Sequence, residues 1–276
     1  MTEARYGSIG SELSAVQVWV CNNEDLPMAF AETLACHWLD EEERHTASRF
    51  IFDRDRDQYL VAHAFVRRVL SLELGFPESE LRIKRTAKGR PFLDGEDAVA
   101  RRFRMRPDFN LSHTRGVNAV AVGYGRRVGI DVERVDRTSR SRLDLFSGVF
   151  SDREQRWLGA LPEERRPHAL LRLWTLKEAY TKARGLGMSL PFDSFDFNLS
   201  AERGVLEFRP PPCDESGLWQ FVELQPSPRA LVALAIDVSG GVPARKIEIR
   251  HGFPWKSPDP VVVTMPQSLV VAEEHY

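Results

Sequence analysis

The spacing of apolar positions divides the first half of the chain into strands and one long helix. Val16 to Val20 alternates in the manner of a half-buried strand. From residue 54 to residue 74, apolar side chains recur near helical spacing, and Gly75 follows as a typical helix stop. Segments with strand-like composition and turn residues at their ends lie at 81–84, 109–113 and 117–122.

The second half repeats this order of elements. A strand is predicted at 128–133, and Ser151 and Glu154 form a capping-box signature, in which each side chain can bond the other's free backbone N–H, so a helix begins there. A longer helix is predicted from about Pro167 to Arg184, followed by strands at 195–199, 219–224 and 231–236. Corresponding elements lie about 112 residues apart, without clear residue identity between the halves. The pattern favours an α+β architecture of two similar halves with a cleft between them.

Pattern and composition together divide the chain into four segments. Residues 1–15 lack periodicity and predict a loose N-terminus, whereas 16–126 and 127–239 form the two halves. Residues 240–276 carry five prolines and predict an extension that either packs over one half or hangs loose.

Composition and charge narrow the range of partners. The chain is 42% hydrophobic and has a formal net charge of −2, so no overall field favours nucleic acid or a membrane surface. Its three cysteines are widely spaced and include no CxxC pair, which predicts neither disulfides nor zinc and fits a reducing cytoplasm. No leader pattern is present, and no apolar run approaches the ~18 residues of a membrane span. We expect a soluble cytoplasmic protein with no nucleic-acid and no membrane partner.

Two stretches place acidic side chains where they could meet. Asp131 and Glu133 are two apart on a predicted strand and share one face, whereas Trp174, Glu178 and Lys182 are four apart on a predicted helix and share another. If strand and helix pack together, three carboxylates form a cluster that repels itself without a cation, and oxygen ligands of this kind suit Mg²⁺ holding a substrate phosphate. Each stretch alone would more often be a solvated face, so the spacing leaves the reaction open.

Other polar residues are candidates for binding a phosphate. The turn Lys88 to Pro91 places cations on both sides of a glycine, so side chains and backbone N–H groups could surround an anion. Further cations that could add to this site are Arg44, Arg49 and Arg54. Ser112 and His113 are adjacent on a strand and face opposite sides, so they cannot form a nucleophile and base pair with each other, and a phosphate-contacting pair is favoured. A solvated basic surface and a structural histidine remain alternatives.

These residues give the chain a family resemblance. It resembles the 4′-phosphopantetheinyl transferases of the surfactin-synthetase-activating type, over residues 16 to 237. The matching motifs are Gly89–Pro91, Phe109–Thr114, Gly129–Glu133, Phe150–Ser151 with Glu154, and Trp174–Lys182 followed by Gly185. The resemblance implies transfer of the phosphopantetheine arm of coenzyme A to a serine hydroxyl of an apo acyl or peptidyl carrier protein, with release of adenosine 3′,5′-bisphosphate. It also implies a pseudo-twofold monomer with coenzyme A in the cleft.

By position, the resemblance assigns roles to the two stretches. Asp131, Glu133 and Glu178 resemble ligands of Mg²⁺, for which Mn²⁺ could substitute, and they also hold the pyrophosphate of coenzyme A. Glu178, or a metal-bound water that it positions, takes the proton from the carrier serine. Lys182 stabilises charge on the leaving phosphate, and Lys177 helps to bind it. The expected catalytic residues are therefore Glu178, Lys182 and Asp131.

The resemblance also predicts the contacts to coenzyme A. The 16–126 half is expected to hold its 3′-phosphate and adenine, and the 127–239 half the metal site and catalytic helix. The expected contacts are Arg49, Arg54, Lys88, Arg90, Ser112, His113, Lys177 and Lys182. Gln58 departs from the family pattern, because many relatives carry an arginine at this position, so one phosphate contact is in doubt.

Two other functions remain as alternatives. One is a different Mg²⁺-dependent phosphotransferase or phosphodiesterase that uses the same acids, and the other is a non-catalytic protein that binds coenzyme A or carrier proteins. The presence of all three acids and of Lys182 favours an enzyme. The sequence does not specify whether the carrier belongs to fatty-acid, polyketide or nonribosomal-peptide synthesis.

Overall fold

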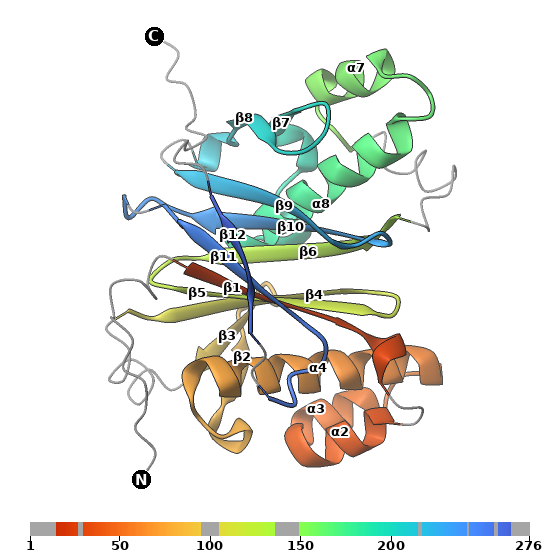
Figure 1. The fold of residues 1–276 in the computed structure, drawn as a ribbon, viewed down its shortest axis with the longest axis vertical. Helices are drawn as coiled ribbons and strands as arrows, with labels where there is room; N and C mark the ends of the chain where they lie inside the picture. Colours follow the sequence, from red (N-terminus) through yellow and green to blue (C-terminus); the bar gives the residue numbers. More distant parts are fainter. Residues whose placement is uncertain are drawn as a thin grey trace.

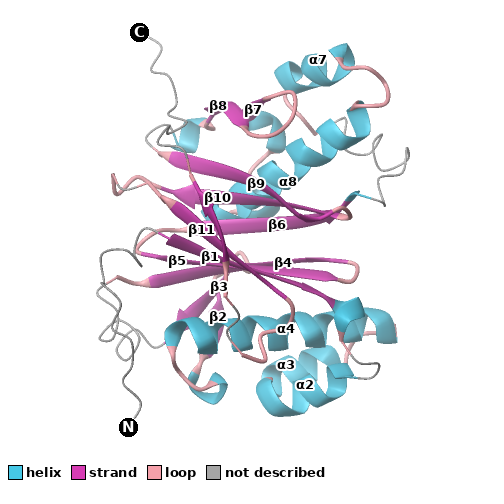
Figure 2. Ribbon diagram, in the orientation of Figure 1, coloured by secondary structure: helices cyan, strands magenta, loops and turns pink. Residues whose placement is uncertain are grey.

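The protein stacks its helices and strands in four layers (Figure 1). The computed structural model describes residues 15–26, 30–94, 105–135, 149–214, 217–241, 243–256 and 259–265. A helical layer covers one face of a five-stranded sheet, a three-stranded sheet packs on the other face, and a second helical layer closes the stack (Figure 2). The α+β class predicted from the sequence is confirmed.

The five-stranded sheet combines strands from both ends of the described chain. In spatial order they are β12 (Val261–Thr264), β11 (Lys246–His251), β1 (Ala15–Asn22), β5 (Val117–Tyr124) and β4 (Pro107–Thr114). Three helices cover this sheet: α2 (Phe30–Trp38), α3 (Glu41–Ala47) and α4 (Asp53–Leu74). Because successive strand side chains point to opposite faces, Trp19 joins the core beneath α4 whereas Val18 joins the core between the two sheets.

The three-stranded sheet forms the second half of the core. Its strands in spatial order are β6 (Val128–Arg134), β10 (Ala230–Asp237) and β9 (Trp219–Ser227). Helix α8 (Arg166–Arg184) packs on its outer face, and α7 (Asp152–Ala160) packs against α8. Ile130 and Val132 point into the core between the sheets, so Asp131 lies on the opposite face of β6, towards α8.

The repeated order of elements predicted from the sequence is confirmed. Each half runs through a strand, a long helix, a small antiparallel hairpin and two further antiparallel strands. The hairpins are β2 (Arg82–Arg85) with β3 (Pro91–Asp94), and β7 (Asp196–Leu199) with β8 (Val205–Arg209). The spatial orders β1-β5-β4 and β6-β10-β9 correspond strand for strand. Short 3-10 turns join the elements: η1 (Asn23–Asp25), η2 (Glu78–Glu80), η4 (Gly187–Ser189), η5 (Phe192–Ser194) and η6 (Pro212–Asp214).

Several helix ends follow the sequence signals. Ser151 and Glu154 form both hydrogen bonds of the predicted capping box at the start of α7. The long helices α4 and α8 stop at Gly75 and Gly185, which adopt left-handed backbone angles with φ of 67° and 66°. None of the described helices combines the length and apolar character needed to cross a bilayer.

Residues after 240 contribute strands to the first sheet. β11 pairs in parallel with β1, where Val16 lies opposite Ile247, and β12 pairs with β11. Ile247 is fully buried between the sheets, and Phe253 joins the core beneath α2 and α4. The described part of the extension is therefore packed into the fold instead of hanging loose. The division at 16–126, 127–239 and 240–276 stays a prediction.

Candidate active site

The candidate site lies at the seam where β4 meets β6. One edge of β6 pairs with β10, and its other edge presents backbone N–H groups that need acceptors. Side chains of β4 supply them at every second position. The bonds run from Val128 N to Asp108 Oδ2 (2.9 Å), from Ile130 N to Asn110 Oδ1 (3.0 Å) and from Val132 N to Ser112 Oγ (3.3 Å). This ladder of side chains fixes the register of β4 against β6.

The ladder places Ser112 beside Asp131. The Ser112 hydroxyl donates to Asp131 Oδ1 (2.9 Å), and Lys182 Nζ donates both to Ser112 Oγ (2.8 Å) and to Asp131 Oδ1 (2.6 Å). Asp131 and Ser112 are 5% and 3% exposed. Because the hydroxyl's single O–H is committed to Asp131, Ser112 supports that carboxylate in this arrangement, and its phosphate contact stays a prediction.

The second oxygen of Asp131 and the carboxyl group of Glu178 fit a cation. Asp131 Oδ2 is buried and has no hydrogen-bond partner in the described part of the chain. Burial and the charge of Asp131 raise the pKa of Glu178, although the Lys182 ammonium opposes the shift. A cation between the two carboxylates would satisfy the orphaned oxygen and relieve their repulsion.

The predicted three-carboxylate set is not pre-assembled. Among the described residues, no three His, Cys, Asp or Glu side chains converge as a complete metal site. Glu133 is half-buried on the same strand as Asp131, two positions further on. Asp131, Glu133 and Glu178 therefore offer suitable donor chemistry, and their joint role as ligands stays a prediction.

A glycine allows α8 to approach β6 closely. A Cβ atom at Gly129 would lie 2.5 Å from the backbone N of Ala183 and closer still to the carbonyl oxygen of Ala179. Both are backbone atoms of α8, so no side chain can move away to make room. The close approach brings Lys182 within reach of Asp131.

Lys177 lies away from the acids. Its ammonium pairs with Glu154 (2.8 Å) and donates to the carbonyl oxygens of Phe192 and Phe195 (2.5 Å each), and the side chain is 0% exposed. Burial lowers the pKa of Lys177, against the opposing effect of the Glu154 carboxylate. The ammonium is enclosed beneath α7, and its three donors bond the Glu154 carboxylate and these two carbonyl oxygens. The ligand contact of Lys177 stays a prediction.

Arg90 is also buried. Its guanidinium pairs with Asp108 (2.5 Å) and donates to the carbonyl oxygens of Val128 (3.1 Å) and Lys182, and the residue is 9% exposed. A phosphate could reach this group only if some of these bonds broke. All contacts of Arg90 named here are with the protein, and its predicted contact with the ligand stays a prediction.

The remaining predicted cations lie at the surface. Arg49 and Arg54 are exposed near the start of α4, and Arg54 pairs with its neighbour Asp55 at 3.1 Å. Lys88 is exposed in the β2–β3 turn and donates to Ser189 Oγ (2.8 Å). His113 is exposed at the end of β4, and desolvation followed by the charge of Lys182 lowers its pKa. These side chains are accessible to an anion.

Gln58 is part of a closed network of amides that the sequence did not reveal. It accepts from Asn23 (3.0 Å) and donates to Asn118 (2.7 Å), and Asn118 in turn donates to Asn23 (2.6 Å). The backbone N of Gly116 also donates to Gln58 (3.0 Å). Gln58 therefore ties α4 to β5 and to the β4–β5 turn instead of offering a cation to a phosphate.

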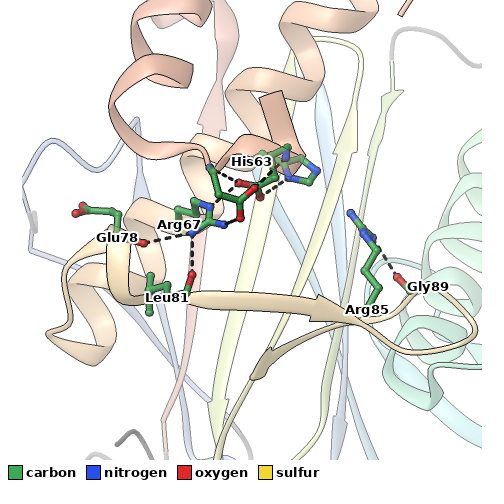
Figure 3. Close-up of polar contacts among 8 residues, drawn as sticks. His63, Arg67, Glu78, Leu81, Arg85 and Gly89 are labelled. Carbon is green, nitrogen blue, oxygen red and sulfur yellow. Dashed lines mark hydrogen bonds and ion pairs between the residues drawn. The ribbon is translucent and has the colours of Figure 1, made fainter. Parts of the chain in front are cut away.

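A second polar cluster between α3 and α4 also escaped the sequence prediction. Glu43 bonds His63 Nδ1 (2.9 Å) and Arg67 Nε (2.6 Å), and Arg67 donates to the carbonyl oxygens of Glu78 and Leu81 (Figure 3). Tyr59 stacks on the His63 ring with centroids 3.9 Å apart. The four-residue spacing of Tyr59, His63 and Arg67 on one helix face was the signal available in the sequence.

Comparisons with known proteins support the 4′-phosphopantetheinyl transferase family. Residues 127–234 match the family described as the 4′-phosphopantetheinyl transferase superfamily, and residues 26–123 match the family described as 4′-phosphopantetheinyl transferase, N-terminal. The 4′-phosphopantetheinyl transferase HetI of Nostoc sp. is 30% identical over 220 residues, which cover 79% of this chain and 86% of the relative. The L-aminoadipate-semialdehyde dehydrogenase-phosphopantetheinyl transferase of Xenopus laevis is 27% identical, over 75% and 71% of the two chains. A holo-(acyl-carrier-protein) synthase from Bacillus anthracis, solved in complex with CoA (3′,5′-ADP), is 19% identical over 40% of this chain and 94% of its own, with a TM-score of 0.34, which is too low to bear on the fold.

Proposed function

The chain belongs to the 4′-phosphopantetheinyl transferase family, and we propose on this premise that the cluster of Ser112, Asp131 and Lys182 is its transfer site. An enzyme of this class moves the 4′-phosphopantetheine arm of coenzyme A to a serine hydroxyl of an apo carrier protein. The observation that carries the proposal is the buried Asp131 carboxylate, which has one oxygen on the Lys182 ammonium and the other without a partner in the described part of the chain.

The side chains of the cluster divide the reaction between them. The serine oxygen bonds to the phosphorus that carries the pantetheine arm, and the bond from that phosphorus to the bridging oxygen breaks. Adenosine 3′,5′-bisphosphate leaves with the electron pair, and the Lys182 ammonium stabilises its charge. Glu178 takes the serine proton, and its raised pKa brings it closer to the working pH of a general base.

Asp131 and Glu178 would hold Mg²⁺, with Glu133 as a third ligand. When bound, the metal ion would polarise the attacked phosphoryl group and neutralise charge on the pyrophosphate. In the absence of the ion, Lys182 balances the charge of Asp131, while Ser112 fixes the orientation of the carboxylate.

The two-part architecture supports the surfactin-synthetase-activating type within the family. One chain carries both repeats, with strand orders that correspond, so it would act as a monomer. Exposed Arg49, Arg54, Lys88 and His113 would bind the phosphates of coenzyme A. The carrier would be an acyl or peptidyl carrier protein, and the reaction would take place in the cytoplasm.

Mass spectrometry tests the function and the site together. Wild-type protein incubated with coenzyme A, Mg²⁺ and an apo carrier should add the mass of one phosphopantetheine arm to the carrier. Asp131→Asn should lower the rate by about 10²-fold or more, because it removes the charge that pairs with Lys182. The matched control is Asp152→Asn, which changes an exposed carboxylate in the first turn of α7 and should leave the rate unchanged. A wild-type rate in Asp131→Asn would refute the site.

A further inference from the structure

Arg90 joins three elements that are distant in the sequence. It follows the β2–β3 turn, its guanidinium pairs with Asp108 on β4, and it donates to the carbonyl oxygen of Val128 at the start of β6. Its third acceptor is the carbonyl oxygen of Lys182 in the last turn of α8. The last carbonyl groups of a helix lack partners within the helix, and a cation there is favourable. Arg90 therefore ties the end of α8 to the start of β6.

The partners of Arg90 are also the parts that build the transfer site. Asp108 is the first acceptor of the side-chain ladder, because the same oxygen that meets Arg90 also accepts from Val128 N (2.9 Å). Lys182 is held at its backbone by Arg90, while its ammonium reaches Asp131 (2.6 Å). One guanidinium thus contacts both the backbone of Lys182 and the start of β6, the strand that carries Asp131.

The space for Arg90 depends on a glycine. Gly185 ends α8 in the left-handed conformation, and a Cβ atom there would lie 2.8 Å from Arg90 Cδ. The side chain therefore lies in a slot that the end of α8 leaves open. With three acceptors and 9% exposure, its guanidinium could turn to a coenzyme A phosphate only by giving up its ion pair with Asp108 and its bonds to two carbonyl oxygens.

We propose that Arg90 is a positioning residue of the transfer reaction, which holds Lys182 against Asp131 and makes no contact with coenzyme A. This inference rests on the proposed function. It replaces the assignment of Arg90 to the 3′-phosphate with a role in the geometry of the reacting end of coenzyme A.

Kinetics with two donors separate these roles. For Arg90→Met, we expect kcat to fall at least about tenfold with coenzyme A and equally with 3′-dephospho-coenzyme A, while each KM changes by less than about threefold. Asp108→Asn keeps an acceptor for Val128 N but loses the ion pair, so it should show the same pattern more weakly. The control Lys84→Ala breaks an exposed ion pair with Asp94 (2.6 Å) on the same hairpin and should change neither constant.

Two kinetic results would overturn the proposal. A rise in KM for coenzyme A alone, with kcat retained, would place Arg90 on the 3′-phosphate. Unchanged kcat and KM in folded Arg90→Met would show that the residue is only structural. If Arg90→Met does not fold, Asp108→Asn and Arg90→Lys supply the same comparison, because each retains part of the contact.

A denaturation cycle tests the coupling without using the transfer reaction. If Arg90 positions Lys182, then Lys182→Met should lower the denaturation midpoint less in the Arg90→Met background than in the wild type. Strictly additive shifts would reject the positioning role, even in a protein that proved to modify no carrier. Conversely, a coupled cycle in a protein without transfer activity would reject the proposed function and leave the contact between Arg90 and Lys182 in place.

Discussion

Replacing Gly129 with alanine tests the close packing on which the site depends. The added Cβ atom would lie 2.5 Å from Ala183 N, 2.9 Å from Ala183 Cβ and closer still to the Ala179 carbonyl oxygen. All three are part of α8, and two belong to its backbone. The helix therefore has to withdraw from β6, because no rotamer change can remove the overlap.

The expected size of the effect follows from these distances. Carbon and oxygen atoms in close contact lie roughly 3.3–3.6 Å apart, so the added Cβ and the Ala179 carbonyl oxygen must separate by more than about 1 Å. Overpacking of a dense core costs about 1–3 kcal/mol. Lys182 and Glu178 move with the helix, and a displacement of about 1 Å can lower a reaction rate by about 10²-fold. We therefore expect a loss of activity that is larger than the loss of stability would suggest.

Two measurements and a matched control check this reasoning. Chemical denaturation gives the change in unfolding free energy, and the rate of carrier modification gives the activity at a temperature where the variant is folded. Gly159→Ala is the control, since nothing lies within 4 Å of its added Cβ and it stands in helix α7, where alanine should stabilise by up to about 1 kcal/mol. Wild-type stability and rate in Gly129→Ala would refute the argument.

Three further predictions follow from buried groups. Glu178→Gln should slow transfer by about 10²-fold or more, yet raise the denaturation midpoint of metal-free protein at pH 7. Burial and the neighbouring Asp131 carboxylate raise the pKa of Glu178 above its ordinary 4.5, so the folded state binds the proton more tightly and loses stability as pH rises through that pKa. The difference in denaturation midpoint between variant and wild type should therefore vanish below about pH 4. A midpoint lower than that of the wild type at pH 7 would contradict this reasoning. Lys177→Met should lower the free energy of unfolding by about 3–5 kcal/mol, because it leaves the Glu154 charge buried without its partner. The KM for coenzyme A should not rise selectively, and such a rise would support the predicted contact of Lys177 with the ligand. Ile247→Ala should lower the free energy of unfolding by about 2–5 kcal/mol, because Ile247 is fully buried. The control Val262→Ala, at a 49% exposed position, should change this free energy by less than about 0.5 kcal/mol. Equal effects of the two variants would exclude β11 from the core.

The sequence predicts which helix and strand carry the site better than it predicts which side chains are buried. Periodicity placed Asp131 on the face of β6 that meets α8, and the four-residue spacing placed Glu178 and Lys182 on one side of the helix. The family resemblance assigned Lys177, the neighbour of Glu178, to the same site. Adjacent helix residues point about 100° apart, however, and only the fold shows that Glu154 lies on the side that Lys177 faces.

Pairings between distant segments also escape prediction. β11 lies parallel to β1, and parallel strands need a long crossover, so no local turn marks the pair in the sequence. The contacts of Arg90 and Gln58 were missed for the same reason. Their partners Lys182 and Asn118 are distant in the chain, and no sequence pattern indicates that these residues are in contact.

The contact between β4 and β6 brings together residues of both halves at the candidate site. Each repeat has a three-strand order in which the first strand pairs with only one neighbour from its own half. The other edge of β1 pairs with β11. The other edge of β6 bonds the side-chain ladder of β4, which also places the Ser112 hydroxyl beside Asp131. The contact that satisfies an exposed strand edge is therefore the contact that assembles the site. Since Ser112 comes from one half and Asp131 and Lys182 from the other, neither half contains the cluster alone, and its geometry depends on how the two halves pack together.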